Sequence, residues 1–165
     1  MKKLTLPLSK KDIQGLQLGE LVYLSGTLFS ARDNTHQKLI NMINNGEELP
    51  VKLEGASIYY MGPTPPKVGV VCGSAGPTTS SRMDRYTSAL LDKGLKVMIG
   101  KGNRSEEVKT SIKRNNAIYF STIGGAGAYL ADRIKKMQSI ASPEFGPEAI
   151  YQIDVEFFPV IVSYK

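Results

Sequence analysis

Residues 95–120 read LKVMIGKGNRSEEVKTSIKRNNAIYF, which places a strand, a helix and a second strand in succession. Residues 95–99 and 117–120 are short and almost entirely apolar, which is typical of parallel strands covered on both faces. Between them Ser105 is suited to cap a helix over 105–115, and two glutamates in the first turn favour the positive end of its dipole. This unit predicts an α/β domain.

The same alternation continues on both sides of this unit. The pattern predicts strands at 21–29, 56–61, 68–72, 149–156 and 160–164, and helices at 31–44, 79–93 and 127–137. The first 60 and the last 20 residues favour antiparallel pairing. We therefore expect a mixed α/β domain with layered sheets. The length of 165 residues is typical of one domain, residues 1–165, with a sizeable core.

The composition narrows the class of protein. The chain is 41% hydrophobic and 22% charged, and no apolar run approaches the roughly 18 residues needed to cross a bilayer. Pro7 and the lysines after it interrupt the basic N-terminus, so we expect no secretory signal and a cytoplasmic location. The net charge is +6, but the basic residues are scattered among carboxylates and form no nucleic-acid motif. An anionic small substrate or an acidic partner explains the charge at least as well.

Cysteine and histidine are each present once, as Cys72 and His36. One thiol cannot form an internal disulfide or hold an iron–sulfur cluster, and one imidazole excludes a His-rich metal site within the chain. We expect no metal ligands or cofactor-binding residues in this chain.

Ligands of open α/β sheets bind at the carboxyl ends of the strands, and four such ends are candidates. At the first, Arg32 and His36 are spaced to share one face at the start of a helix, where a cation opposes the helix dipole. A residue that breaks a local rule often serves function. Equally, Arg32 could be a surface residue paired with Asp33 or a later acid, and His36 a simple polar contact.

The second end, residues 71–84, is the densest functional signal. Small residues including Gly76 allow a ligand to approach the backbone, and hydroxyl residues then open a helix whose free N–H groups favour an anion. Arg82 adds a cation four residues after Thr78, so a helix would place both on one face. The stretch is not a Walker A loop, and a tight turn with a helix cap is the alternative interpretation.

At the third end Lys101 stands between two glycines and could direct its ammonium into the crevice, or be a solvated turn lysine. The fourth end, 121–128, contains Gly125-x-Gly127 but lacks the Rossmann spacing, so it favours close packing or anion contact. Two arginines and a lysine at neighbouring strand ends suit a substrate with two carboxylates. The strand ends offer no Cys–His pair and no paired acids, which indicates that half of an active site lies elsewhere.

The motifs ARDNTH (31–36), GPTTSSRMD (76–84) and GKGN (100–103), with TIGGA (122–126) and EAI (148–150), occur in the order found in a known family. Nearly the whole chain resembles the β component of class I iron–sulfur fumarases and L-tartrate dehydratases. The combination is specific, although each piece alone is weak.

The resemblance implies a swivelling β/β/α domain that is either a separate subunit or the C-terminal domain of a longer chain. It implies a partner α subunit carrying a [4Fe–4S] cluster with one open iron that acts as a Lewis acid, and a heterotetramer or a homodimer of β chains. The implied reaction is reversible hydration of fumarate to malate, with tartrate dehydration as the alternative. The alternative from a different functional class is an anion-binding module without catalysis.

By motif position, the resemblance assigns binding of the dicarboxylate to Arg32, Arg82 and Lys101, supported by Gly76 and Thr79. These cations would also stabilise the aci-carboxylate that forms on proton loss. Thr78 corresponds to the proposed base, and nearby cations and N–H groups would have to lower its pKa. Lys101 also belongs to the implied catalytic set, and Asp33 and His36 would orient groups or transfer protons.

Overall fold

The computed structural model describes residues 1–165. The strands are β1 (Lys2–Thr5), β2 (Leu21–Ser30), β3 (Ser57–Tyr59), β4 (Val97–Gly100), β5 (Ile118–Ser121), β6 (Ile134–Ala141) and β7 (Ile150–Tyr164). The helices are α1 (Lys10–Gln14), α2 (Asp33–Asn44), α3 (Asp84–Asp92), α4 (Glu106–Arg114) and α5 (Gly127–Ala131), with short 3₁₀ helices η1 (Ser80–Met83) and η2 (Pro143–Glu148).

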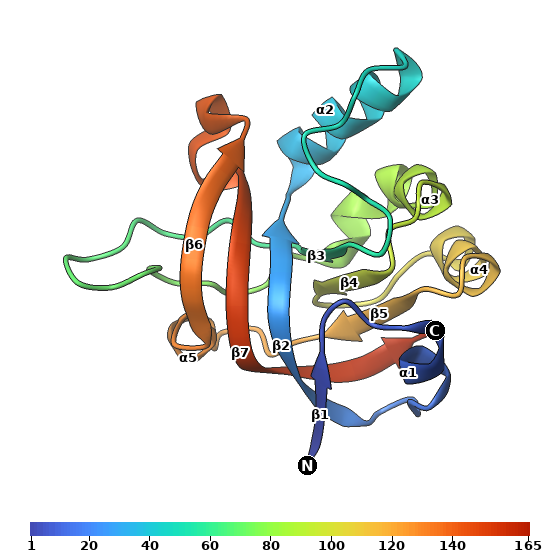
Figure 1. Cartoon of the computed structure of the whole chain (residues 1–165), viewed down its shortest axis with the longest axis horizontal. Coiled ribbons are helices and arrows are strands. Elements are labelled where there is room, and N and C mark those ends of the chain that lie inside the picture. The colour runs from blue at the N-terminus through green and yellow to red at the C-terminus, as the bar shows by residue number, and fades with distance from the viewer.

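The sheet closes into a barrel. Strands β2, β3, β4 and β5 are parallel neighbours, and β7 is antiparallel to both β5 and β2, which completes the ring. Strands β1 and β6 extend the sheet outside the ring by pairing with β2 and β7. Strand β7 bends at Phe157, which has a positive φ of 50°, so one strand can reach both sides of the ring (Figure 1). The structure is therefore a mixed α/β domain whose sheet forms a closed barrel.

Alternation along the central strands separates two cores, because successive side chains point to opposite faces of a sheet. Val97 and Ile99 of β4 point into the barrel with Phe120 of β5. Met98 of β4 and Tyr119 of β5, which alternate with these residues along their strands, face the other way and pack under the helices. Both faces of these strands are buried, which confirms the expectation from their apolar runs.

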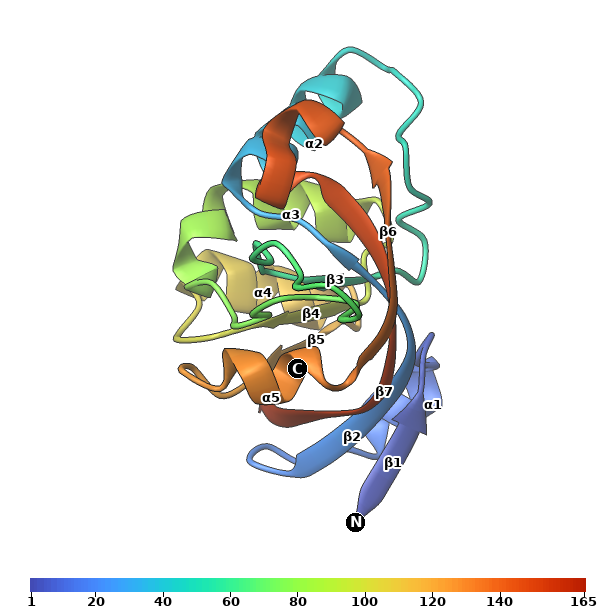
Figure 2. The ribbon, with the colours of Figure 1, turned by 90° about the vertical axis from the view of Figure 1, so that its left-hand side faces the viewer.

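Helices α2, α3 and α4 lie together along the outer face of the parallel strands (Figures 1 and 2). They bury Leu39, Leu90 and Ile112 against that face. Ser105 accepts a hydrogen bond from the Val108 N–H and caps α4 as predicted. No helix of the chain is long and apolar enough to span a membrane.

Several predicted elements are wrong or incomplete. Residues 68–72 form no strand: Val68 is fully exposed, and the segment belongs to the long loop that projects past β6 (Figure 1). A short apolar run looks the same as a buried strand until its neighbours are known. The helix predicted over 127–137 stops at Ala131, and β6 follows.

The ends of the chain also differ from expectation. The strands predicted at 149–156 and 160–164 are one continuous strand, β7. Strand β1 was not predicted, and it pairs parallel to β2, so only the β7 pairings confirm the expected antiparallel character. The helix predicted over 79–93 is divided into η1 and α3.

Candidate functional site

The carboxyl ends of the parallel strands meet along one edge of the barrel, which we call the strand-end edge. Ser30 pairs with Tyr59, Tyr59 with Ile99, and Gly100 with Ser121. Because these four ends are in register, the residues that follow them lie side by side. This edge is where the parallel topology predicts a ligand.

The segment containing Thr78 crosses this edge and is held by backbone hydrogen bonds. The Thr78 N–H donates to the carbonyl of Tyr60 at 2.7 Å, and the Ser80 N–H donates to the carbonyl of Lys101 at 2.9 Å. Thr79 forms an isolated parallel bridge with Lys101. The structure thus brings Thr78, Thr79 and Lys101 together, as the sequence predicts.

Gly76 lies where this segment meets the start of α5. The Ala75 N–H donates to the carbonyl of Gly127 at 3.1 Å, and a Cβ on Gly127 would collide with Ser74 and lie 3.2 Å from the Gly76 nitrogen. The small residues are therefore required for close packing between two loops.

Arg82 is joined to the start of α2 by an ion pair. Its Nη2 donates to Asp33 Oδ2 at 2.8 Å, and Arg82 is half exposed. Thr78 precedes the Thr79 cap of η1 and lies outside that helix, so the expectation that Thr78 and Arg82 share a helix face is wrong. Thr79 is exposed and its hydroxyl makes no capping bond.

The guanidinium of Arg32 is largely enclosed but poorly satisfied. Its Nε is buried without a hydrogen-bond partner, and the nearest carboxylate oxygen, of Glu148, is 4.0 Å away. A Cβ on Gly62 would collide with this guanidinium, so a glycine is needed where the arginine lies. Glu148 is also engaged by Asn34, whose Nδ2 donates to it at 2.7 Å. Arg32 thus keeps donors available at the strand-end edge.

Lys101, unlike Arg32 with its distant contact to Glu148, takes part in none of the ion pairs of the chain. Its stem runs beside Gly124, where a Cβ would lie 3.6 Å from the lysine Cδ. Thr122, which follows β5, is tied to the same edge because its N–H donates to the carbonyl of Gly100 at 2.9 Å.

His36 is completely buried behind Arg32. Its Nδ1 lies 2.7 Å from the carbonyl oxygen of Arg32, and because a carbonyl only accepts, Nδ1 carries the proton. Nε2 has no partner, and the ring packs edge-on against Tyr60 and tilted against Tyr86. Burial is the main cause that lowers the pKa of His36 to about 4, so the imidazole is neutral at physiological pH.

The residues of this chain do not fit an iron–sulfur cluster. Cys72 is its one thiol and is buried, and burial raises the pKa of that thiol. No group of three or more His, Cys, Asp or Glu side chains converges in a way that could hold a metal ion. Several thiolates are needed for a cluster.

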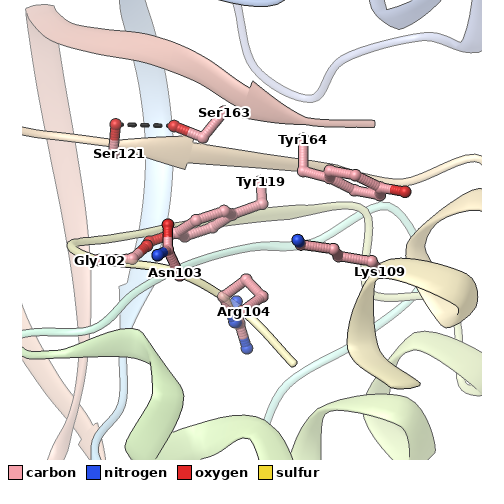
Figure 3. A pocket seen from close by; sticks show the side chains of 8 residues that line it. All are labelled: Gly102, Asn103, Arg104, Lys109, Tyr119, Ser121, Ser163 and Tyr164. Carbon is pink, nitrogen blue, oxygen red and sulfur yellow. Dashed lines mark hydrogen bonds between the residues drawn. The ribbon is translucent and has the colours of Figure 1, made fainter. Parts of the chain in front are cut away.

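Beside the strand-end edge lies a pocket of about 280 Å³ (Figure 3). It is lined by Gly102, Asn103, Arg104, Lys109, Tyr119, Ser121, Ser163 and Tyr164, so it does not include the three predicted cations. Arg104 and its partner Asp84 were not singled out from the sequence. A cation just before the Ser105 cap opposes the helix dipole, and that signal could have identified Arg104 as it did Arg32.

Several known enzymes are similar to this chain over most of its length. The chain is 40% identical over 155 residues to "Fumarate hydratase 2" of Leishmania major, covering 93% of this chain and 27% of that protein. It is 42% identical over 141 residues to "Fumarate hydratase class I, anaerobic" of Escherichia coli K12, covering 84% of this chain and 26% of that protein. The chain thus spans about a quarter of these enzymes.

A third relative has nearly the same extent as this chain. It is "Putative L(+)-tartrate dehydratase subunit beta" of Methanocaldococcus jannaschii, 36% identical over 162 residues, with 94% of this chain and 83% of that protein covered. The family model described as Fumarase C-terminus matches residues 2–164. This chain therefore belongs to the Fumarase C-terminus family.

Proposed function

We propose that this chain is the β-type part of a class I hydro-lyase that reversibly hydrates fumarate to malate. Family membership supports the reaction class, and the strand-end edge supplies the chemistry. The observation that carries the proposal is a pair of available cations at this edge. Arg32 has a buried donor without a partner, and Lys101 has no acid beside it.

A dicarboxylate is the ligand that these groups suit. Arginine binds a carboxylate through two parallel hydrogen bonds, and lysine acts as a point charge. In the proposal Arg32, Arg82 and Lys101 bind the two carboxylates, with Gly76 and Thr79 allowing the substrate to approach the backbone. Arg82 is held by Asp33 until a substrate carboxylate shares or replaces that contact.

The same cations assist loss of a proton next to a carboxylate, since that step places a second negative charge on the carboxylate. Thr78 is the proposed base, and Lys101 is the next candidate. Asp33 and His36 complete the proposed catalytic set. Because His36 is buried and hydrogen-bonded to the Arg32 carbonyl, its proposed role is to orient Arg32.

The rest of the active site belongs to a partner in this proposal. Since one buried thiol does not fit a cluster, the partner α subunit would hold the [4Fe–4S] group. Residues 1–165 would act as one domain of the swivelling type, within a heterotetramer or around a homodimer of β chains, in the cytoplasm. Binding to the α subunit would bring the strand-end edge opposite the cluster.

Tartrate dehydration is the second candidate, because a relative that is 36% identical to this chain is named for that reaction. Both reactions remove water from a hydroxylated diacid, so both use the same cations.

The experiment that tests the proposal is an anaerobic assay of the chain reconstituted with its α subunit on fumarate, malate and the tartrate isomers. We expect the isolated chain to be colourless and inactive, and the complex to be active. A stable brown chromophore with activity in the isolated chain would contradict the subunit assignment. Diacid binding without turnover in the complex would instead support an anion-binding module.

A further inference from the structure

Arg104 forms a buried polar centre directly beneath the strand-end edge. Its side chain is 1% exposed, and all three guanidinium nitrogens have partners. Nε donates to Asp84 at 2.7 Å, Nη2 to Thr87 at 2.8 Å, and Nη1 to the hydroxyl of Tyr60 at 3.2 Å. Burial acts to lower the pKa of Arg104, but the hydroxyl of Tyr60 and the carboxylate of Asp84 together outweigh it and raise that pKa.

The partners of Arg104 either belong to a segment that carries a proposed site residue or are hydrogen-bonded to one. The backbone carbonyl of Tyr60 accepts the N–H of Thr78 at 2.7 Å. Asp84 lies two residues after Arg82 and begins α3. Arg104 itself lies three residues after Lys101. One guanidinium therefore connects the segment 78–84, which carries the proposed base and one proposed cation, the Lys101 loop, and Tyr60, to which the Thr78 N–H is bonded.

Tyr119 closes this centre from the side of β5. Its hydroxyl donates to the carbonyl of Gly102 at 2.8 Å and is 2.9 Å from the hydroxyl of Ser80, which can donate to it. The guanidinium of Arg104 lies 4.9 Å from the centre of the Tyr119 ring and 5.2 Å from that of Tyr60. Figure 3 shows Arg104 and Tyr119 lining the same pocket.

The segments around Gly100 are packed closely together. A Cβ on Gly100 would collide with the Ser80 hydroxyl and lie 2.8 Å from the Tyr60 ring. The second carboxylate oxygen of Asp84 accepts the N–H of Ser105 at 2.7 Å, so Asp84 also fixes the start of α4. The η1 segment and the Lys101 loop are thus held against each other by ionic, hydroxyl and steric contacts.

We propose that Arg104 is a positioning residue that sets the mutual placement of Thr78, Arg82 and Lys101; the inference rests on the proposed hydro-lyase function. A planar guanidinium fixes three directions at once, whereas a lysine ammonium is a point charge that cannot satisfy Asp84, Thr87 and Tyr60 together. Small misplacements of catalytic groups can lower rates by about 100-fold. Arg104 touches no substrate and acts only through these neighbours.

The test is steady-state kinetics of Arg104→Lys in the complex with the α subunit, at a temperature where circular dichroism shows the variant fully folded. We expect kcat to fall at least tenfold. The matched control is Arg114→Lys, which makes the same change in an arginine paired to Asp92 on the surface, 3.0 Å away. The control should keep kcat within twofold.

Should Arg104→Lys fail to fold, Tyr119→Phe removes one hydroxyl from the same centre while keeping the ring, and a several-fold lower kcat is expected. If the wild-type complex is active and folded Arg104→Lys keeps kcat within twofold of it, the inference is overturned while the proposed function stands. The same result for Tyr119→Phe overturns the inference if the lysine variant does not fold. Inactivity of the wild-type complex on every diacid would overturn the proposed function, and this inference with it.

Discussion

Two arginine–aspartate pairs, one at the strand-end edge and one beneath it, have nearly the same nitrogen–oxygen distance in different surroundings. Arg82 donates to Asp33 at 2.8 Å, and the two side chains are 51% and 23% exposed. Arg104 donates to Asp84 at 2.7 Å, with exposures of 1% and 13%. Each aspartate belongs to one of the sequence motifs, so motif membership alone does not distinguish them.

The difference between the pairs lies in what water can do for them. An exposed pair contributes only about 0–1 kcal/mol, because solvent and salt compete for both charges. In the proposed function, a substrate carboxylate would therefore replace Asp33 at little cost. Removing one partner of a buried pair costs about 3–5 kcal/mol, since the other charge is left without water. The edge is thus suited to exchanging ligands. The buried Arg104–Asp84 pair beneath it is suited to holding the residues of the edge in place.

The largest expected effect on activity is at the edge, from Thr78→Ala. If Thr78 is the base, kcat should fall by roughly 10²–10⁴, with a much smaller change in KM, because proton transfer occurs only in the transition state. Stability should change by less than about 1 kcal/mol, since the Tyr60 contact uses the backbone of Thr78. Exchange of the substrate C3 proton with solvent, followed by NMR in single turnovers, is the measurement.

Thr78→Ser provides the internal control, because it keeps the hydroxyl and should keep partial activity. Exchange at the wild-type rate in Thr78→Ala would assign the base to another group, and Lys101 would be tested next.

Arg82→Lys sharpens the comparison because it keeps the charge at the exposed pair. We expect a loss of about 2–4 kcal/mol in transition-state stabilisation, measured from kcat/KM, since lysine cannot make the planar two-pronged contact. Thermal unfolding should be nearly unchanged, as for other exposed pairs. Wild-type turnover would show that Arg82 serves the fold only.

The burial of the residues beneath the strand-end edge can be tested through His36, the one histidine of the chain. Its folded pKa of about 4 lies below the ordinary unfolded value of about 6.5, so the unfolded chain binds the proton more readily. Its contribution to stability is fully present above pH 6.5 and is lost as the pH falls towards 4, to a total of up to about 3 kcal/mol. Urea unfolding across this range measures the loss.

The imidazole can also be observed directly, because its NMR signal is not overlapped by another histidine. The signal should not titrate near pH 6.5 in the folded protein. Titration near pH 6.5 would show that water reaches the ring. The buried residues around His36 would then not be separated from the exposed strand-end edge. His36→Gln, which removes the titrating group, should flatten the acid limb of the stability curve.

The smallest expected effect is at a third pair, Arg114–Asp92, where the side chains are 57% and 54% exposed. Arg114→Lys should change the free energy of unfolding by less than about 0.5 kcal/mol. A loss of several kcal/mol in urea unfolding would mean that exposure does not determine what these pairs contribute.

Much of the fold can be predicted from sequence because local patterns determine it. The apolar runs at 95–99 and 117–120 and the capped helix at 105–115 lie where expected, since each carries its own period or cap. The strand predicted at 68–72 was wrong because a five-residue apolar run does not show whether a neighbouring strand exists to pair with it. Closure of the barrel was not predicted, because it depends on β7 pairing with strands far away in the sequence.

The candidate site divides in the same way. Arg32 and Lys101 directly follow parallel strands, which place their carboxyl ends at one edge, so topology brings these two together. Thr78 and Arg82 follow no strand, because the one predicted at 68–72 does not form; backbone hydrogen bonds of Thr78 and Ser80 hold their segment at the edge. The buried layer depends on side chains that meet across the fold, as Tyr119 meets Gly102, and no local spacing reveals such contacts. Two available cations and a buried neutral imidazole emerged only from the three-dimensional arrangement.

The closure of the barrel by β7 also determines when the site can form during synthesis. The Tyr151 N–H donates to the hydroxyl of Ser30 across 121 positions of the chain, and β7 is the last strand. Contacts so distant in sequence slow folding, since a long loop must close before they stabilise anything. Until β7 is synthesised, β2 is paired only with β1 and β3 and lacks its long antiparallel neighbour. The strand-end edge, with Arg32 just beyond β2, is therefore completed only when residues 150–164 have paired with β2 and β5.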